Sequence, residues 1–536
     1  MIKQKLYNMK TTIQKLWISI AMLCLSLQVS ASDFEINGVQ YTITSFTELK
    51  VRASGISENV TGDVTIPSTV TFKGKELAVV AIGNSFAEKN NKITSITIGD
   101  GVKEIGDNAF QYCSNLSRVT IPEGVTRIGK ETFENCSKLE KVEALGVNTI
   151  EASAFANCEN LTSCVFKSLE EIGEKAFTQV GFVSIDLPST VTTIGRRAFY
   201  QCNKLVSFNI PYNVKKIEED IIGECESLKE LTIGNGIDEL PPICLNCPKL
   251  EKVRIEDSEN SLLIIIGNSL PNSSSLDPIL GTIYYYSSIF SGCGLKEVYI
   301  GRNLKPKWSE VESGCFIKAP FQGFGISKVV IGPYVTSIEM RCKPDWPDRY
   351  YTEQAFDDCE ELTEVIFQSS LIKEIPEEAF SGCSNLQKIK LPNSVQRIED
   401  WAFEECNSLS TIDLGESLEY IGYGSFSGCD QLSTINIHSS NPPSCESGFS
   451  SQSYINTIVN VPPGSLSLYQ NTAPWNNFWN LKEDNHLSAG IDNASTTFNA
   501  EELTRYTING QKISAPSKGL NIIRYNDGSV KKVVVQ

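Results

Sequence analysis

The sequence is poor in histidine, the side chain that enzymes use most often for acid–base chemistry at neutral pH. Its 536 residues include 2 histidines, His438 and His486, and we interpret both as surface residues. Ser-His-Asp and Cys-His catalysis would have to use one of them, as would most zinc sites. The GxGxxG, GxxxxGK[ST], HExxH and GxSxG motifs are also missing. We therefore expect no enzymatic activity, no cofactor and no metal site.

Clusters of basic residues and long apolar runs are scarce as well. The chain has 47 Lys and Arg against 64 Asp and Glu, a net charge of −17, which argues against nucleic acid as a partner. Its one long apolar run, Leu16–Leu27, is too short for a comfortable membrane span. The run follows four lysines and precedes Val29-Ser30-Ala31, so residues 1–31 are predicted to be a cleaved signal peptide. Lipidation at Cys24 is the alternative, which Leu23 disfavours because a lipobox needs a small residue there.

What the chain has in abundance is one recurring unit. Its clearest copy is Ile105–Arg127, with the sequence IGDNAFQYCSNLSRVTIPEGVTR, and the copies follow one another at intervals of 22 or 23 residues. One run begins at Ile82, Ile105, Ile128, Ile150, Ile172, Ile194, Ile217 and Leu240, and after a gap a second run begins at Ile375, Ile398 and Ile421. A fixed period of this length is typical of a solenoid in which each repeat forms one turn.

Each unit predicts a short strand, a turn and a return into the interior. Val119 and Ile121 alternate with polar residues, which favours a half-buried strand that Pro122 ends. Ala109 and Phe110 have helix-like spacing with the following cysteine, which suggests a short helical turn on the opposite wall. Because the same strand returns in every turn, the strands should lie parallel, with right-handed crossovers.

Most of the 17 cysteines follow the same period. Those at the cysteine position of the unit are Cys113, Cys136, Cys158, Cys202, Cys225, Cys247, Cys293, Cys359, Cys383, Cys406 and Cys429. A thiol packs well in a buried column, and side chains that point the same way from successive turns have poor geometry for disulfides. We therefore expect free buried thiols. Cys164 and Cys244, which stands where Phe is usual, are predicted to lie in the core, and a bridge between Cys315 and Cys342 is left open.

The unit resembles the BspA-like (Treponema-type) leucine-rich repeat. The pattern that carries the resemblance is I-G-x-x-A-F-x-x-C-x-x-L-x-x-I-x-I-P-x-x-V, matched over roughly residues 80–440. The resemblance implies a right-handed repeat solenoid of the leucine-rich-repeat type, with parallel β-strands on the concave side and short helical turns opposite. It also implies a role in recognition, commonly on bacterial surfaces.

The predicted repeats span residues 81–438, and residues 32–80 precede them. The latter are predicted to form β-hairpins that turn at Asn37-Gly38 and Thr61-Gly62. Such a segment would cap the exposed strand edge of the first repeat, whereas the alternative is a separate ligand-binding module.

Beyond the repeats, residues 439–482 resemble the family's terminal unit and are predicted to form a C-terminal cap. The lid residues of this cap would be Trp475, Phe478 and Trp479. Residues 483–499 are rich in Ser, Thr and Asn, a composition that predicts a linker.

The tail, residues 500–536, is predicted to form two hairpins that turn at Asn509-Gly510 and Asn526-Asp527-Gly528. In YTINGQKI, KGLNIIRYNDG and KKVVVQ it resembles the C-terminal sorting domain of the type IX secretion system of Bacteroidota. The alternative is a small β-domain without a sorting role.

Three insertions interrupt consecutive turns, at residues 256–289, 301–320 and 339–352, each after the strand. Equivalent points of adjacent turns are neighbours in a solenoid, so these loops should meet at one edge, and such insertions often mark a binding face. The alternative is that the insertions pack on themselves, with Ile264–Ile266 as an extra strand.

The insertions are rich in Tyr and Trp beside Arg, residue types that are frequent at interface hot spots. The outward row of the neighbouring strands also becomes apolar there, which is typical of a contact surface. The candidate ligand-binding residues are Tyr299, Val330, Ile366, Trp308, Trp346, Tyr350 and Tyr351.

The sequence therefore predicts a secreted or cell-surface protein that acts as a non-catalytic recognition and adhesion module. The expected partner is a host or neighbouring-cell protein, the mature chain has no predicted transmembrane segment, and we expect a monomer. A passive structural spacer or scaffold and a glycan-binding protein are the alternatives.

Overall fold

The computed structural model of the chain divides into two units, Met1–Leu487 and Ser488–Gln536. The described residues are 33–259, 262–266, 276–277, 281–282, 289–290, 292–307, 321, 324–340, 354, 356–445, 447–487, 502–507, 512–513, 519–525 and 530–535. The predicted signal peptide, Cys315 and Cys342 lie outside them. No helix among the described residues is long and apolar enough to cross a membrane.

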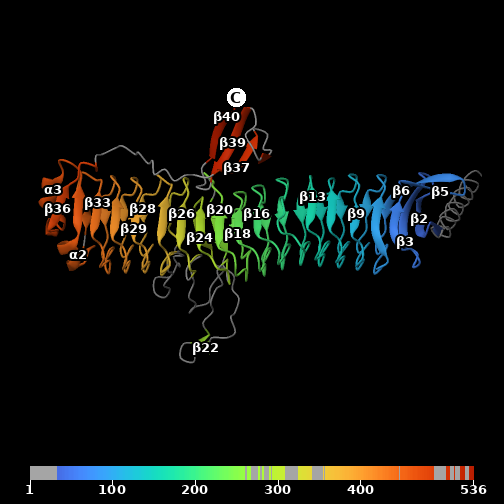
Figure 1. Cartoon of the computed structure of the whole chain (residues 1–536), viewed down its shortest axis with the longest axis horizontal. Coiled ribbons are helices and arrows are strands. Elements are labelled where there is room, and N and C mark those ends of the chain that lie inside the picture. Colours follow the sequence, from blue (N-terminus) through green and yellow to red (C-terminus); the bar gives the residue numbers. More distant parts are fainter. Residues whose placement is uncertain are drawn as a thin grey trace, which may run out of the picture. The chain divides into compact units, whose positions relative to one another are not determined.

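The first wall of unit 1 is a row of parallel strands, called here the long-strand row, in which successive turns lie side by side (Figure 1). Its first sheet holds β4 (Gly62–Ile66), β7 (Ile93–Ile98), β9 (Arg118–Thr120), β11 (Lys141–Ala144) and β13 (Ser163–Phe166). Its second, six-stranded sheet holds β16 (Ser207–Ile210), β18 (Glu230–Ile233), β20 (Lys252–Ile255), β24 (Glu297–Ile300), β26 (Lys328–Ile331) and β27 (Glu364–Phe367). Its third holds β29 (Lys388–Lys390), β31 (Thr411–Leu414), β33 (Thr434–Ile437), β35 (Ile458–Val461) and β36 (Asn480–Glu483).

A second wall, the short-strand row, consists mostly of two-residue strands that also pair in parallel. Its first part is β8 (Glu104–Ile105), β10 (Arg127–Ile128), β12 (Thr149–Ile150), β14 (Glu171–Ile172), β15 (Thr193–Ile194) and β17 (Lys216–Ile217). It continues as β19 (Glu239–Leu240), β21 (Leu263–Ile266) and β25 (Leu304–Lys307), and then as β28 (Glu374–Ile375), β30 (Arg397–Ile398), β32 (Tyr420–Ile421) and β34 (Ser444–Cys445). A separate antiparallel pair joins β22 (Leu276–Asp277) and β23 (Gly281–Thr282).

The register of both rows follows the sequence period. Val119 pairs with Val142, which pairs with Cys164, so each residue meets its equivalent in the next turn. Within β9 and β11 buried and exposed side chains alternate, as the sequence predicts for a half-buried strand. The repeat solenoid of the leucine-rich-repeat type is thereby confirmed.

The third wall consists of hydrogen-bonded turns instead of the predicted short helical turns. Asn108 N donates to Lys130 O at 2.9 Å and Phe110 N to Thr132 O at 2.9 Å, so this wall is also held by backbone bonds between turns. Helical geometry is excluded because Asn108 and Tyr112 have φ values of 57° and 60°, in the left-handed region.

The interior is built from columns of identical side chains. The Phe110 and Phe133 ring centroids are 5.3 Å apart with an interplanar angle of 8°, and Phe155 continues the stack at 5.3 Å. The cysteine column lies beside them: Cys136 Sγ donates to Phe110 O at 3.2 Å and Cys158 Sγ to Phe133 O at 3.1 Å. The cysteines of the described part are all free, and most are buried, which confirms the predicted free thiols there.

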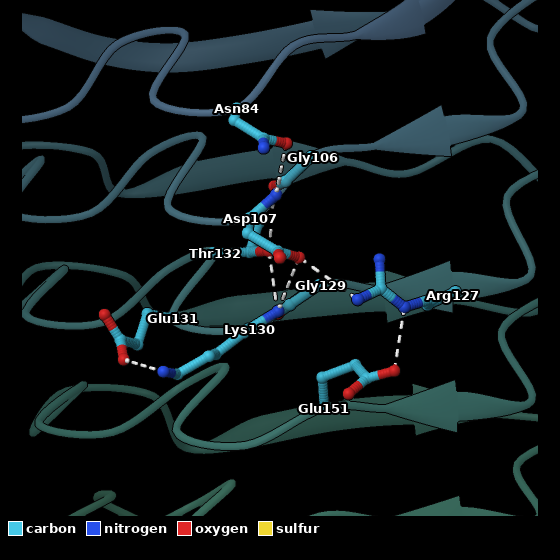
Figure 2. A network of polar contacts seen from close by, with 9 residues as sticks. All are labelled: Asn84, Gly106, Asp107, Arg127, Gly129, Lys130, Glu131, Thr132 and Glu151. Carbon is cyan, nitrogen blue, oxygen red and sulfur yellow. Dashed lines mark hydrogen bonds and ion pairs between the residues drawn. The ribbon is translucent and has the colours of Figure 1, made fainter.

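The close approach of neighbouring turns explains why glycine follows the first isoleucine of the unit (Figure 2). Asn84 Oδ1 accepts a hydrogen bond from Asp107 N at 3.1 Å, and Asp107 Oδ1 accepts one from Lys130 N at 3.1 Å. A Cβ on Gly106 would lie 2.4 Å from Asn84 Oδ1 and 2.5 Å from Asn84 N. Glycine is therefore required where the side chain of one turn caps the backbone of the next.

The same corner carries ion pairs between turns. Arg127 Nη2 lies 3.1 Å from Asp107 Oδ1 and its Nε lies 2.8 Å from Glu151 Oε1 (Figure 2). All three side chains are more than one third exposed, and pairs of this kind contribute less than about 1 kcal/mol. The backbone caps, more than these pairs, set the spacing of the turns.

The long-strand row is interrupted between β13 and β16 and again between β27 and β29, and the first interruption has a cause in the sequence. Val180 stands at the cysteine position, and only Gly181 separates it from Phe182, where other units have two residues before their leucine. Residues 183–187 form no strand, so the first sheet ends at β13 and the second begins at β16. The short-strand row continues past this point from β14 to β15.

At the N-terminal end, β1 (Asp33–Ile36), β2 (Val39–Ser45) and β3 (Lys50–Ile56) extend the short-strand row, with the predicted turn at Asn37-Gly38. The second predicted hairpin is wrong, because Thr61-Gly62 leads into β4, which pairs in parallel with β7. The second hairpin instead joins β5 (Thr69–Phe72) to β6 (Lys75–Ile82).

At the C-terminal end, α2 (Ser451–Asn456), α3 (Leu466–Gln470) and the 3-10 helix η1 (Trp475–Asn477) surround β35 and β36. Trp475 is fully buried and donates from Nε1 to Pro443 O at 2.7 Å, and the ring of Phe478 lies 5.3 Å from that of Phe449. These two residues close the core, whereas Trp479 is 76% exposed.

Unit 2 is a four-stranded antiparallel sheet in the order β38-β37-β39-β40. Its strands are β37 (Glu502–Thr507), β38 (Lys512–Ile513), β39 (Gly519–Tyr525) and β40 (Val530–Val535). Both predicted hairpins are present, as β37–β38 and β39–β40.

Replacing Gly106 by alanine is expected to destabilise unit 1 by about 2 kcal/mol, because the added methyl group meets the backbone of the preceding turn. The matched control is Gly325→Ala, since the nearest atom to a Cβ there is Glu361 Cγ at 3.9 Å. Urea unfolding followed by circular dichroism measures both variants, and equal midpoints for the two would contradict the account of the Ile-Gly step.

Because the thiols of the cysteine column are buried, we expect the free energy of unfolding to fall at alkaline pH. Burial raises the pKa of the Cys202 thiol from 9.0 to about 12, so the unfolded chain releases this proton at lower pH than the folded one. The stabilisation is complete below pH 9 and is lost as the pH rises toward 12. Cys202→Val, which copies Val180 at the equivalent position, is expected to reduce this loss by up to about 1.4 kcal/mol per pH unit. Urea midpoints measured across this range provide the check, and parallel curves for the two proteins would refute it.

Candidate functional site

The outward face of the six-stranded sheet carries two columns of side chains. The first alternates in charge: Glu230, Lys252, Glu297, Lys328 and Glu364 follow one another across five strands. Lys252 Nζ lies 3.2 Å from Glu297 Oε2, and Lys328 Nζ lies 2.8 Å from Glu364 Oε2. These pairs are partly exposed and add little stability, but they leave the face close to neutral within an acidic protein.

The second column contains three of the predicted ligand-binding residues, Tyr299, Val330 and Ile366, in direct register on β24, β26 and β27. The Tyr299 side chain is 8% exposed because the Arg254 guanidinium carbon lies 3.6 Å from its ring centroid. This is a cation–π contact. Val330 and Ile366 are half-buried.

The Tyr299 hydroxyl group is also held in place, by a hydrogen bond. It donates to Asp257 Oδ1 at 2.7 Å, and burial together with the Asp257 charge raises its pKa. Arg254 in turn lies 3.4 Å from Glu256 Oε1 and 3.6 Å from Asp257 Oδ2. The Tyr299 ring therefore lies beneath Arg254, and the guanidinium group of Arg254 covers the ring.

Several residues next to this face were missed by the sequence prediction. Arg254 and Asp257 take part through their contacts with Tyr299, and Tyr334, which is near Asp257, is 37% exposed. Tyr334 follows Pro333 in the turn after β26, and the charge of Glu259 raises its pKa. Aligning the residues after each strand would have identified Tyr334, whereas no sequence signal predicts the cation–π contact.

A buried arginine binds backbone carbonyl groups of the same region in the interior of the solenoid. Arg302, directly after β24, is fully buried, and its guanidinium donates to Ile237 O at 2.8 Å, Asn235 O at 3.1 Å and Gly234 O at 3.2 Å. Burial lowers its pKa to about 10. It ties the corner after β18 to the turn of β24.

The insertions begin later in the turn than the sequence prediction had placed them. Ile264–Ile266 belongs to β21 and residues 304–307 form β25, so the predicted ranges 256–289 and 301–320 contain the short strands of their own turns. The repeat resumes at Phe290, Phe321 and Phe356, whose rings stack at 6.4 Å and 5.9 Å. The extra residues therefore leave the repeat between the short-strand row and the third wall.

The structure describes only part of the predicted site. Tyr299, Val330 and Ile366 belong to the long-strand row, whereas the insertions start and end at a different wall. The insertion aromatics Trp308, Trp346, Tyr350 and Tyr351 lie outside the described residues.

A second group of exposed apolar side chains surrounds the first interruption of the long-strand row. Val165, Val183 and Val206 are 49%, 54% and 38% exposed. Over the described part of the chain, no three His, Cys, Asp or Glu side chains form a group that could hold a metal ion.

The parallel rows, the phenylalanine and cysteine columns and the outward sheet face define a leucine-rich-repeat protein. A model of the family described as "BspA type Leucine rich repeat region" matches six copies, over residues 80–205, 170–296 and 350–471. The chain belongs to this family, whose repeats form protein-interaction modules.

Solved structures of several bacterial proteins are similar to this chain. A leucine-rich repeat protein from Bacteroides ovatus is 27% identical, with 76% of this chain and 94% of that chain covered and a TM-score of 0.39. A leucine rich cell surface protein from Faecalibacterium prausnitzii is 24% identical, with the same coverage and a TM-score of 0.36. The pneumococcal vaccine antigen PcpA is 16% identical, with 84% and 96% covered and a TM-score of 0.30. No curated protein matches the chain.

The bond between Tyr299 and Asp257 is expected to couple the two residues by about 1.5 kcal/mol, the range for a hydrogen bond to a charged group. A double-mutant cycle with Tyr299→Phe and Asp257→Asn measures this coupling in urea unfolding. The control is Tyr212→Phe, since Tyr212 is 59% exposed and its replacement should leave the midpoint unchanged. Additive effects of the two site substitutions would show that the bond does not hold the tyrosine.

Proposed function

We propose that the chain is an exported, non-catalytic recognition module that binds a protein through the outward face of its six-stranded sheet. The observation that carries the proposal is the pair of half-buried aliphatic side chains, Val330 and Ile366, in direct register beside the Arg254–Tyr299 stack. Apolar groups of this kind on a rigid surface favour contact with a partner. Arginine and tyrosine are also enriched among the residues that dominate protein interfaces.

The geometry favours a protein partner over a glycan. A sugar-binding platform needs an open aromatic face, and the ring of Tyr299 is covered by Arg254. The charged column beside it is internally paired, so the face offers neither a strong positive nor a strong negative field to a highly charged ligand. A protein surface with an apolar centre and a polar rim fits this combination.

The proposed cellular setting rests on the sequence. The signal-like residues 1–31 support export, and the resemblance of residues 500–536 to a type IX sorting domain supports delivery to the cell surface. Residues 32–80 and 439–482 are proposed as the caps of the solenoid.

A binding screen of residues 32–536 against extracellular matrix proteins and glycans tests this function. Val330→Asp and Ile366→Asp are each expected to weaken binding to a protein partner at least tenfold, about 1.4 kcal/mol, because each places a charge in the apolar contact. The matched control is Asn209→Asp, in the outward column of β16 in the same sheet, which should bind as the unchanged protein does.

Circular dichroism establishes that each variant is folded. If Val330→Asp and Ile366→Asp bind the partner as tightly as Asn209→Asp does, the binding face lies elsewhere. Binding confined to glycans would favour the glycan-binding alternative, and no partner under any condition would favour the spacer.

A further inference from the structure

Most thiols of the cysteine column make the same backbone contact, and Cys293 differs from them. In most turns the Sγ donates to the carbonyl oxygen of the preceding turn's phenylalanine column, at 3.2 Å for Cys202 to Phe177 and 3.3 Å for Cys225 to Phe199. The same contact is present after the insertions, where Cys383 donates to Phe356 O at 3.2 Å. These thiols are inert fillers of a closed core.

Cys293 makes a weaker contact and has a second sulfur beside it. Its carbonyl contact, to Cys244 O, is stretched to 3.9 Å, and its sulfur lies 3.7 Å from Cys244 Sγ. The cause is a change in the neighbouring column, because Cys244 occupies the position where other turns have phenylalanine. A small side chain in place of a ring leaves space into which the Cys293 thiol turns.

The two sulfurs also differ in their access to solvent. Cys244 is fully buried, whereas Cys293 is half-buried, so a reagent in solution can reach Cys293 first. The nearby Cys247 keeps its ordinary contact, donating to Ile222 O at 3.1 Å, and Cys225 likewise keeps its contact with Phe199 O. The Cys247 thiol also lies near both of them, and Cys244 and Cys293 are the pair whose sulfur atoms make a direct contact, at 3.7 Å.

We propose that Cys244 and Cys293 are a redox-active pair that closes to a disulfide when the folded protein meets a disulfide oxidant. The Cys293 thiolate attacks one sulfur of the oxidant, which releases the oxidant's other half as a thiol and leaves a mixed disulfide on Cys293. Cys244 then attacks the Cys293 sulfur and releases the second half as a thiol. The protein loses two hydrogen atoms, and the oxidant disulfide is reduced to two thiols.

The position of the pair gives the bond a structural effect. Cys244 lies in the turn before the first insertion and Cys293 in the turn that resumes after it, so the bond closes the loop that holds the inserted residues. A cross-link over a loop of this length restricts the unfolded chain, and exported proteins meet conditions in which such bonds persist. Oxidation would therefore stabilise the solenoid at its most irregular point. This inference does not depend on the binding face proposed above.

The test uses reduced residues 32–536 incubated, folded, with oxidised glutathione at mildly alkaline pH. Remaining thiols are alkylated in denaturant, and mass spectrometry counts them and maps any linked peptides. The expected result is the loss of two alkylatable thiols, one peptide pair joining Cys244 to Cys293, and a rise in Tm that a reductant reverses.

Two variants remove the pair in different ways. Cys293→Ser changes the half-buried partner, and Cys244→Phe restores the residue usual in that column, so at least one variant should fold. Neither should lose thiols or gain Tm on oxidation, whereas the column control Cys202→Ser should behave as the unchanged protein. The proposal is overturned if all thiols survive oxidation, if the bond joins other cysteines such as Cys225 and Cys247, or if it forms only after denaturation.

Discussion

The close approach of successive turns is the constraint on which this structure depends. Backbone groups of all three walls bond to the equivalent groups one turn away, as the pairing of Val119 with Val142 and the bond from Phe110 N to Thr132 O illustrate. A turn that changed its spacing would break bonds on three sides at once. The strict period, the glycine at the corner and the stacked columns all follow from this requirement.

The same constraint separates the inside of the molecule from the outside. Interior positions meet their own equivalents, so the columns tolerate little more than Phe, Cys or another compact apolar residue. Outward positions meet only solvent and the side chains of neighbouring strands, so they vary freely. The Arg254–Tyr299 stack and the half-buried Val330 are possible because the backbone beneath them is fixed by repetition. A surface of this kind can change its ligand without changing its fold.

The sequence predicted the solenoid, the free thiols and the hairpins of the tail, because each rests on a pattern that repeats or on a turn signal of known geometry. The short-strand row escaped prediction, since a two-residue strand such as Arg127–Ile128 is too short to show alternation. Backbone bonds within the third wall have no side-chain signature, so helical spacing suggested a helix. The hairpin at Thr61-Gly62 was wrong because a glycine turn does not specify which strand its neighbour will pair with.

Prediction of the site was limited by what a sequence says about side-chain neighbours. The outward column was correctly placed in one register, because the strand pattern fixes which residues point outward. Two findings depend on contacts between turns, which no single repeat contains. Arg254 covers Tyr299, and the insertions begin after β21 and β25.

The missing strand at residues 183–187 has a mechanical consequence. At that turn no strand joins β13 to β16, although Val206 N still donates to Val183 O at 2.9 Å, and a second gap in the long-strand row separates β27 from β29. We expect bending or tension applied to the solenoid to concentrate where the long-strand row lacks paired strands. The residue absent between Val180 and Phe182 sets the position of the first of these two gaps.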